Sequence, residues 1–282
     1  MAPCEHRVAL SKRRQGQRRS GALPEQGDSR NRGEDQPEGK AMTASFYVGA
    51  YWRDRPQTLR EYVAQSRRFL VRLRDVHPVF LSWMSSGRTP DSAVALLDDL
   101  SNLEELIFHR ALGEESLFLP SAPDGSPTLD STCPHGFSTS YATGQDAEGP
   151  SVSITTGATS PWLNDSVVIE LPTVSEFGEH EFVKKLLEVM VENWSPRTVV
   201  VSSYAFNRKL NGMDTKLPIV GWMLWLADRS ARDVLRPGVQ SESLAGGLLV
   251  RTTRELFSSE SPDQVATARQ IRDQLREYGF LD

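Results

Sequence analysis

Cysteine and long apolar runs are both scarce in this sequence of 282 residues. The two cysteines are Cys4, in a segment expected to be disordered, and Cys133, in an expected loop, so we predict no structural disulfide. The longest apolar stretch, Leu217–Ala227, is too short to cross a bilayer and contains Pro218 and Gly221. The opening residues have no apolar core of the kind a secretory signal needs. We therefore expect a soluble, cytoplasmic protein with no membrane partner.

Signatures of common catalytic and metal sites are missing as well. The sequence has no G-x-G-x-x-G segment after a strand, no P-loop and no G-x-S-x-G elbow. His180 and Glu181 begin like a zinc-protease motif, but Lys184 stands where the second histidine should be. Cys133 and His135 have no second pair at a metal-binding spacing. We expect no metal, no cofactor and no enzyme activity, with an enzyme whose active site is dispersed along the chain as the alternative.

Charge divides the chain into two parts. Residues 1–41 carry nine Lys and Arg against six Asp and Glu, and the remaining residues carry 23 against 31, a net charge of -8. The first part contains too few apolar residues to offset its ordering entropy, so we predict a disordered basic tail or a translated upstream segment. We predict a single domain over Met42–Asp282. Its acidic balance favours basic partners, although solubility alone explains many acidic surfaces.

Local patterns predict an α+β domain. Phe46–Trp52 is typical of a strand, and residues 54–57 (Asp-Arg-Pro-Gln) predict the start of a helix that ends before Pro78. Residues 89–92 (Thr-Pro-Asp-Ser) predict a second helix with Val94, Leu97, Leu100, Leu103, Leu106 and Ile107 on its buried face. Further strands are expected at Phe137–Thr143, Val152–Thr156, Ser166–Leu171, Thr198–Phe206, Ile219–Ala227 and Gly247–Thr252, and further helices at Glu179–Trp194 and after Ser261.

The order of these elements favours a mixed, mainly antiparallel sheet covered by helices. Asn211-Gly212, between two expected strands, is typical of a hairpin turn. Trp222 and Trp225 stand three apart on one expected strand, so they should point to opposite faces. One of them can then be partly exposed, and exposed tryptophans are common anchors in protein interfaces.

Three aromatic motifs carry a family resemblance. They are G-A-Y-W at Gly49–Trp52, H-P-x-F-x-x-W at His77–Trp83 and V-G-W at Val220–Trp222. With their spacing over about Phe46–Tyr278, the sequence resembles the immunity protein 52 family of bacterial polymorphic toxin systems. The matching positions, which we interpret as fold-defining, are Gly49, Tyr51, Trp52, Trp83, Gly221 and Trp222.

The resemblance implies an α+β immunity protein, encoded beside a secreted toxin, that binds this toxin and neutralises it. It also implies a toxin of the restriction-endonuclease type, and a nuclease must be basic where it holds phosphates. An acidic inhibitor can occupy such a surface. We predict no direct contact with nucleic acid, and a toxin-loading chaperone or adaptor is a further alternative. The predicted toxin-contact residues are Asp98, Asp99, Glu104, Glu105, Glu114, Glu115 and Trp225.

Overall fold

The chain divides into two units, Met1–Ala41 and Met42–Asp282. The computed structural model describes parts of the second unit only, and the predicted tail lies outside them. The described residues are 45–53, 55–85, 93–111, 128–144, 149–160, 163–172, 177–212, 214, 217–254 and 258–281.

One antiparallel sheet organises the described residues of the second unit. Its ten strands follow the order β3-β2-β4-β5-β6-β1-β7-β8-β10-β9, and all neighbouring strands in this order are antiparallel. The predicted α+β class is confirmed, and the sheet that was expected to be mixed is antiparallel at each of these pairings. The strands are β1 (Phe46–Trp52), β2 (Met84–Ser85), β3 (Val94–Ala95), β4 (Phe137–Ala142), β5 (Ser151–Thr156), β6 (Asp165–Leu171), β7 (Thr198–Ser202), β8 (Met223–Leu226), β9 (Gln240–Leu244) and β10 (Gly247–Arg251).

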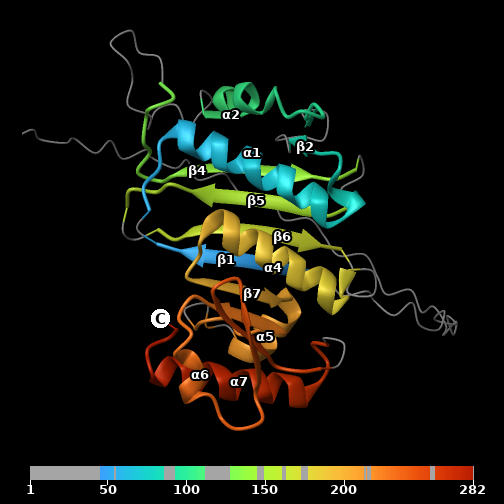
Figure 1. Cartoon of the computed structure of the whole chain (residues 1–282), viewed down its shortest axis with the longest axis vertical. Coiled ribbons are helices and arrows are strands. Elements are labelled where there is room, and N and C mark those ends of the chain that lie inside the picture. Colours follow the sequence, from blue (N-terminus) through green and yellow to red (C-terminus); the bar gives the residue numbers. More distant parts are fainter. Residues whose placement is uncertain are drawn as a thin grey trace, which may run out of the picture. The chain divides into compact units, whose positions relative to one another are not determined.

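Helices α1 (Leu59–Val76) and α4 (His180–Trp194) lie side by side on one face of the sheet, in front of strands β4 to β7 in Figure 1. Helix α5 (Tyr204–Asn211) contacts the other face, where Asn207 Nδ2 donates a hydrogen bond of 2.7 Å to Tyr47 Oη of β1. Helix α7 (Pro262–Glu277) packs against α5. The shorter helical elements are η1 (Pro78–Phe80), α2 (Leu103–Ala111) and α6 (Ala231–Val234).

The alternation of side chains along β1 creates these two faces. Trp52 points toward the helices and stacks on Trp194 of α4, with ring centroids 5.7 Å apart. Trp194 also meets Phe69 of α1 edge-on at 5.5 Å, so an aromatic series joins the central strand to both covering helices. Tyr47 and Tyr51 point the other way, because they alternate with Trp52 along the strand.

The start of α1 differs from the prediction. Residues 54–57 do not begin the helix, and residue 54 lies outside the described residues. Thr58 is the N-cap, since its side chain accepts a hydrogen bond from Glu61 N while Glu61 Oε2 accepts one from Thr58 N. Gln57 accepts a hydrogen bond of 2.9 Å from Thr156 Oγ1 of β5 instead.

The predicted second helix is shorter than expected. Residues 89–92 lie outside the described residues, Val94–Ala95 forms β3, and α2 begins only at Leu103. The side chain of Asn102 holds the intervening turn, because its Oδ1 accepts from Leu97 N at 2.9 Å and its Nδ2 donates to Ala95 O at 3.0 Å. Local side-chain hydrogen bonds therefore override the helical spacing of the leucines.

The predicted strand Thr198–Phe206 ends at Ser202. The Ser203 side chain accepts a hydrogen bond of 3.1 Å from Phe206 N and caps α5 there. The prediction of a hairpin turn at Asn211-Gly212 is wrong, because Asn211 is the last residue of α5 and Gly212 is its C-cap. Strands β7 and β8 still pair antiparallel, but a helix connects them.

Candidate functional site

The predicted acidic residues do not form one helix face. Asp98 and Asp99 lie in the turn before α2, and Glu104 and Glu105 lie in its first turn rather than near its middle. In this position the positive end of the helix dipole stabilises the two glutamates. Residues Glu114 and Glu115 lie outside the described residues.

Arginines of α1 lie beside this acidic segment. The guanidinium of Arg67 donates a hydrogen bond of 2.8 Å to the carbonyl of Leu100, and that of Arg74 donates to the carbonyl of Asp98. Hydrogen bonds from Ser101 and, more weakly, the charge of Arg67 lower the pKa of the Asp99 carboxyl. The negative field of the segment is thus partly compensated by its own neighbours.

Trp225, the predicted exposed anchor, is buried. Its side chain is 3% exposed, and its Nε1 donates a hydrogen bond of 2.8 Å to the carbonyl of Leu244. The prediction of an exposed tryptophan is wrong, because all four residues of β8 are buried, and Trp222 beside it is buried as well. Neither tryptophan offers a surface in this structure.

A polar surface lies on the face of the sheet opposite α1 and α4. At this face β4, β5 and β6 present half-buried or exposed side chains, whereas their alternate residues are buried beneath the helices. Cross-strand hydroxyl pairs, Ser138 with Thr155 at 2.9 Å and Ser140 with Ser153 at 3.2 Å, follow the strand register. We call this surface the open half-face; its residues are Ser138, Ser140, Ala142, Ser151, Ser153, Thr155, Ser166, Val168, Glu170 and Tyr51.

Three tyrosines and one carboxylate form a network at the margin of the open half-face. Tyr204, the first residue of α5, donates a hydrogen bond of 2.8 Å to Glu170 Oε1 of β6. The rings of Tyr204 and Tyr47 lie 5.3 Å apart, and Tyr47 in turn interacts with Tyr51. We call Glu170, Tyr204, Tyr47 and Tyr51 the Tyr–Glu cluster.

The hydroxyls of this cluster remain protonated at neutral pH. Partial burial and the hydrogen bond to Glu170 raise the pKa of Tyr204 to about 12. Burial likewise raises the pKa of Tyr47 and of Tyr51 above the ordinary tyrosine value. Each phenol can therefore act as a hydrogen-bond donor.

Comparison with known proteins gives one family match over nearly the whole second unit. The model of the family described as Immunity protein 52 matches residues 44–282. The chain belongs to this family. No curated protein matches the chain. A solved structure described as a Pseudomonas aeruginosa T6SS protein is 12% identical over 82% of this chain and 73% of its own, with a TM-score of 0.47.

In this Immunity protein 52 member the residues of the G-A-Y-W motif lie on both faces of the sheet. Trp52 enters the core, while Gly49 and Tyr51 share the opposite face. A Cβ atom at Gly49 would lie 2.5 Å from Tyr51 Oη, so the tyrosine ring lies across the glycine. The close neighbour of Gly49 is thus a side chain of the same strand.

The tryptophans of the other two motifs, Trp83 and Trp222, are buried. Trp83 stacks on Phe80 of η1, with ring centroids 5.6 Å apart. A Cβ atom at Gly221 would lie 2.0 Å from the carbonyl oxygen of Val201. Gly221 thus lets its segment approach β7 so that Trp222 N can donate a hydrogen bond of 2.7 Å to the same oxygen.

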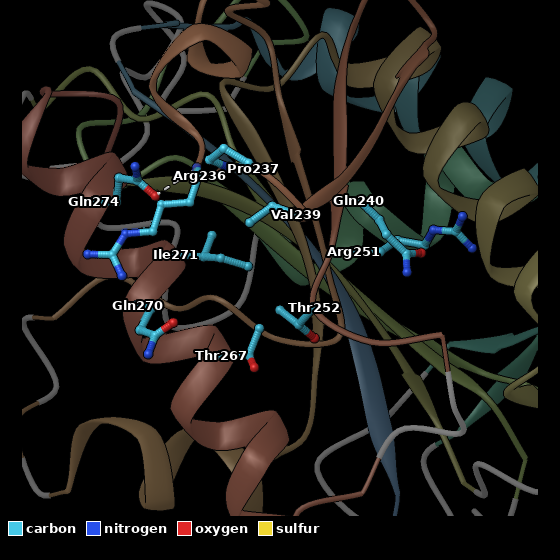
Figure 2. Close-up of a pocket in the computed structure, with 11 residues that line it drawn as sticks. Arg236, Pro237, Val239, Gln240, Arg251, Thr252, Thr267, Gln270, Ile271 and Gln274 are labelled. Atoms are coloured by element: carbon cyan, nitrogen blue, oxygen red, sulfur yellow. Dashed lines mark hydrogen bonds between the residues drawn. The ribbon is translucent and has the colours of Figure 1, made fainter.

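A pocket of about 330 Å³ lies between α7 and the segment that precedes β9 (Figure 2). Arg236 and Arg251 both line it, but their guanidinium groups point in opposite directions. The two charged side chains of this pocket therefore do not converge on one point, as the polar groups of an active site usually do. Among the described residues, no group of His, Cys, Asp or Glu could hold a metal ion. No described helix has the length and apolar character that crossing a membrane requires.

The Tyr–Glu cluster was not foreseen from the sequence. Tyr47 and Tyr51 lie four residues apart on the predicted strand, a spacing that puts both side chains on one face of the sheet. Tyr204 falls in a predicted strand that in fact ends at Ser202, so the sequence prediction misses its position at the start of a helix. The pair of serines at 202 and 203 is the signal that could have indicated this cap, because serine is a common helix N-cap.

Proposed function

We propose that this chain is an immunity protein that neutralises a secreted toxin by direct binding in the cytoplasm of the producing cell, without catalysis. Membership of the Immunity protein 52 family carries the proposal. The two arginines that line the described pocket point apart, an arrangement that does not favour an active site there. A nuclease toxin fits the net charge of -8 outside residues 1–41, since phosphate-binding surfaces are basic.

Growth rescue with a binding measurement tests this function. The C-terminal domain of the toxin encoded by the neighbouring gene would be expressed in a test bacterium with and without the full chain, and the pair isolated. Rescue together with a one-to-one complex supports immunity by direct binding. A complex without rescue identifies a toxin-loading chaperone or adaptor instead. If the chain gives neither rescue nor a complex, the proposal fails for this toxin and this chain.

We further propose that Asp98, Asp99, Glu104 and Glu105 attract a basic toxin during association. All four are exposed, but Arg67 and Arg74 reduce the field of the two aspartates. Reversing Asp98 and Asp99 to lysine should therefore slow association by only about threefold to tenfold at low salt and leave dissociation unchanged. Stopped-flow association at two ionic strengths measures this, and equal rates for variant and wild type would contradict it.

A further inference from the structure

We propose that the Tyr–Glu cluster receives an arginine side chain of the toxin. This inference rests on the proposed function, and it adds the surface and the chemistry of the contact. Glu170 is the one charged residue of the open half-face as defined above, and hydroxyl-bearing side chains surround it. A single carboxylate in an uncharged polar field is complementary to a single cation on a partner surface.

The carboxylate of Glu170 has capacity for a cation. Its Oε1 accepts the hydrogen bond from Tyr204, and no Lys or Arg among the described residues forms an ion pair with it. A carboxylate has about four lone-pair positions, so one phenol leaves room for a guanidinium. The strand register places Tyr47 and Ser151 directly beside Glu170 on the two flanking strands.

One exposed aromatic ring, that of Tyr204, lies beside this carboxylate, and the ring of Tyr47 beneath it is buried. Tyr204 is 61% exposed, which is unusual for a large aromatic side chain whose ring also packs against Tyr47. Tyrosine rings attract cations that lie within about 6 Å of the ring centroid. Arginine suits such a site better than lysine, because its planar guanidinium can stack on a ring while donating to a carboxylate.

The cluster is held in place before any partner arrives. Ser202 Oγ donates to Asn207 Oδ1 at 2.6 Å, and Asn207 Nδ2 donates to Tyr47 Oη at 2.7 Å. Gly49 allows the ring of Tyr51 to lie flat on the strand. Ordered tyrosines lose little conformational entropy on binding, and Tyr and Ser are the residues that antibody paratopes use for the same reason.

The test compares variants of the full chain for binding to the C-terminal domain of the toxin encoded by the neighbouring gene. Glu170→Gln keeps the shape and removes the charge, and Tyr204→Ala removes the ring; each should raise Kd by about tenfold or more. Tyr204→Phe keeps the ring and should change Kd by less than about threefold. Glu188→Gln, the same chemical change on α4 at the opposite face, should leave Kd unchanged.

Thermal midpoints establish that each variant is folded, which the exposure of Glu170 and Tyr204 leads us to expect. If wild type binds the toxin domain and both Glu170→Gln and Tyr204→Ala bind equally well, the cluster is not the contact and this inference alone fails. If wild type neither binds nor rescues, the proposed function fails with it. Sedimentation of the free chain covers a third outcome: a dimer that Glu170→Gln dissociates would assign the cluster to self-association and overturn the inference.

Discussion

Replacing Gly221 by alanine tests how closely the segment before β8 approaches β7. The added Cβ would lie 2.0 Å from Val201 O and 2.6 Å from the Cβ of Ser202. Carbon–oxygen contacts in proteins are about 3.3 Å or longer, so the two segments must separate by about 1 Å. Both neighbours belong to a buried strand, and backbone atoms cannot move aside as a flexible side chain can.

Two costs add to the destabilisation. Overpacking in a tight interior costs about 1–3 kcal/mol. Separation also weakens the hydrogen bond from Trp222 N to Val201 O, 2.7 Å long, and a buried group left without its partner costs about 1–3 kcal/mol. We therefore expect a loss of about 2–6 kcal/mol in the free energy of unfolding. For a unit of this size that loss lowers the thermal midpoint by roughly 4–24 °C.

Calorimetry or thermal unfolding followed by circular dichroism measures this shift. Gly246→Ala is the matched control, since Gly246 has φ +84° and no atom within 4 Å of an added Cβ. The free energy of unfolding of Gly246→Ala should fall by only about 1–2 kcal/mol, which is the cost of holding a residue with a Cβ atom in the left-handed conformation. A midpoint for Gly221→Ala that is no lower than that of Gly246→Ala would refute the steric argument.

Two further predictions concern the core and an acid. Trp194→Ala should destabilise the protein by about 3–5 kcal/mol in urea titration, because Trp194 is fully buried between Trp52 and Phe69; a loss below about 1 kcal/mol would contradict the aromatic series. Burial raises the pKa of the Asp165 carboxyl, so the folded state binds more protons than the unfolded state above the ordinary value of about 3.9, and stability falls as pH rises through the raised pKa. In Asp165→Asn this group no longer titrates, so the fall in stability with pH that it causes disappears. The stability of the variant minus that of wild type should therefore increase between the ordinary and the raised pKa of Asp165 and then level off. A difference in stability that does not depend on pH would contradict this.

The sequence predicted the elements whose caps and periodicity agree. The strand β1 has its predicted bounds, and α7 begins after its predicted Ser261 cap. The prediction failed where a side chain forms hydrogen bonds to backbone groups that the predicted helix or strand would use. Asn102 holds a turn where the leucine spacing favours a helix, and Ser203 starts α5 inside a run of β-forming residues. These competitions depend on contacts that residue spacing does not contain.

The candidate site depends on pairing that the sequence does not specify. Glu170 and Tyr204 meet because β6 and α5 both adjoin β1, and neither neighbour follows from local pattern. Trp225 is buried because both faces of β8 are covered, whereas strand alternation alone predicted one exposed tryptophan. Strand order therefore decides which predicted residues reach the surface.

The central position of β1 has a consequence for synthesis of the chain. Tyr47 pairs with Glu170 on one side and with Ser202 on the other, so the first strand made waits for partners from the last half of the sequence. Such long-range pairing makes folding slow and leaves hydrogen-bonding edges unpaired on the ribosome. Pairing of β1 therefore waits until β6 and β7 have been made, and the supply of folded protein follows the folding rate as well as the rate of translation.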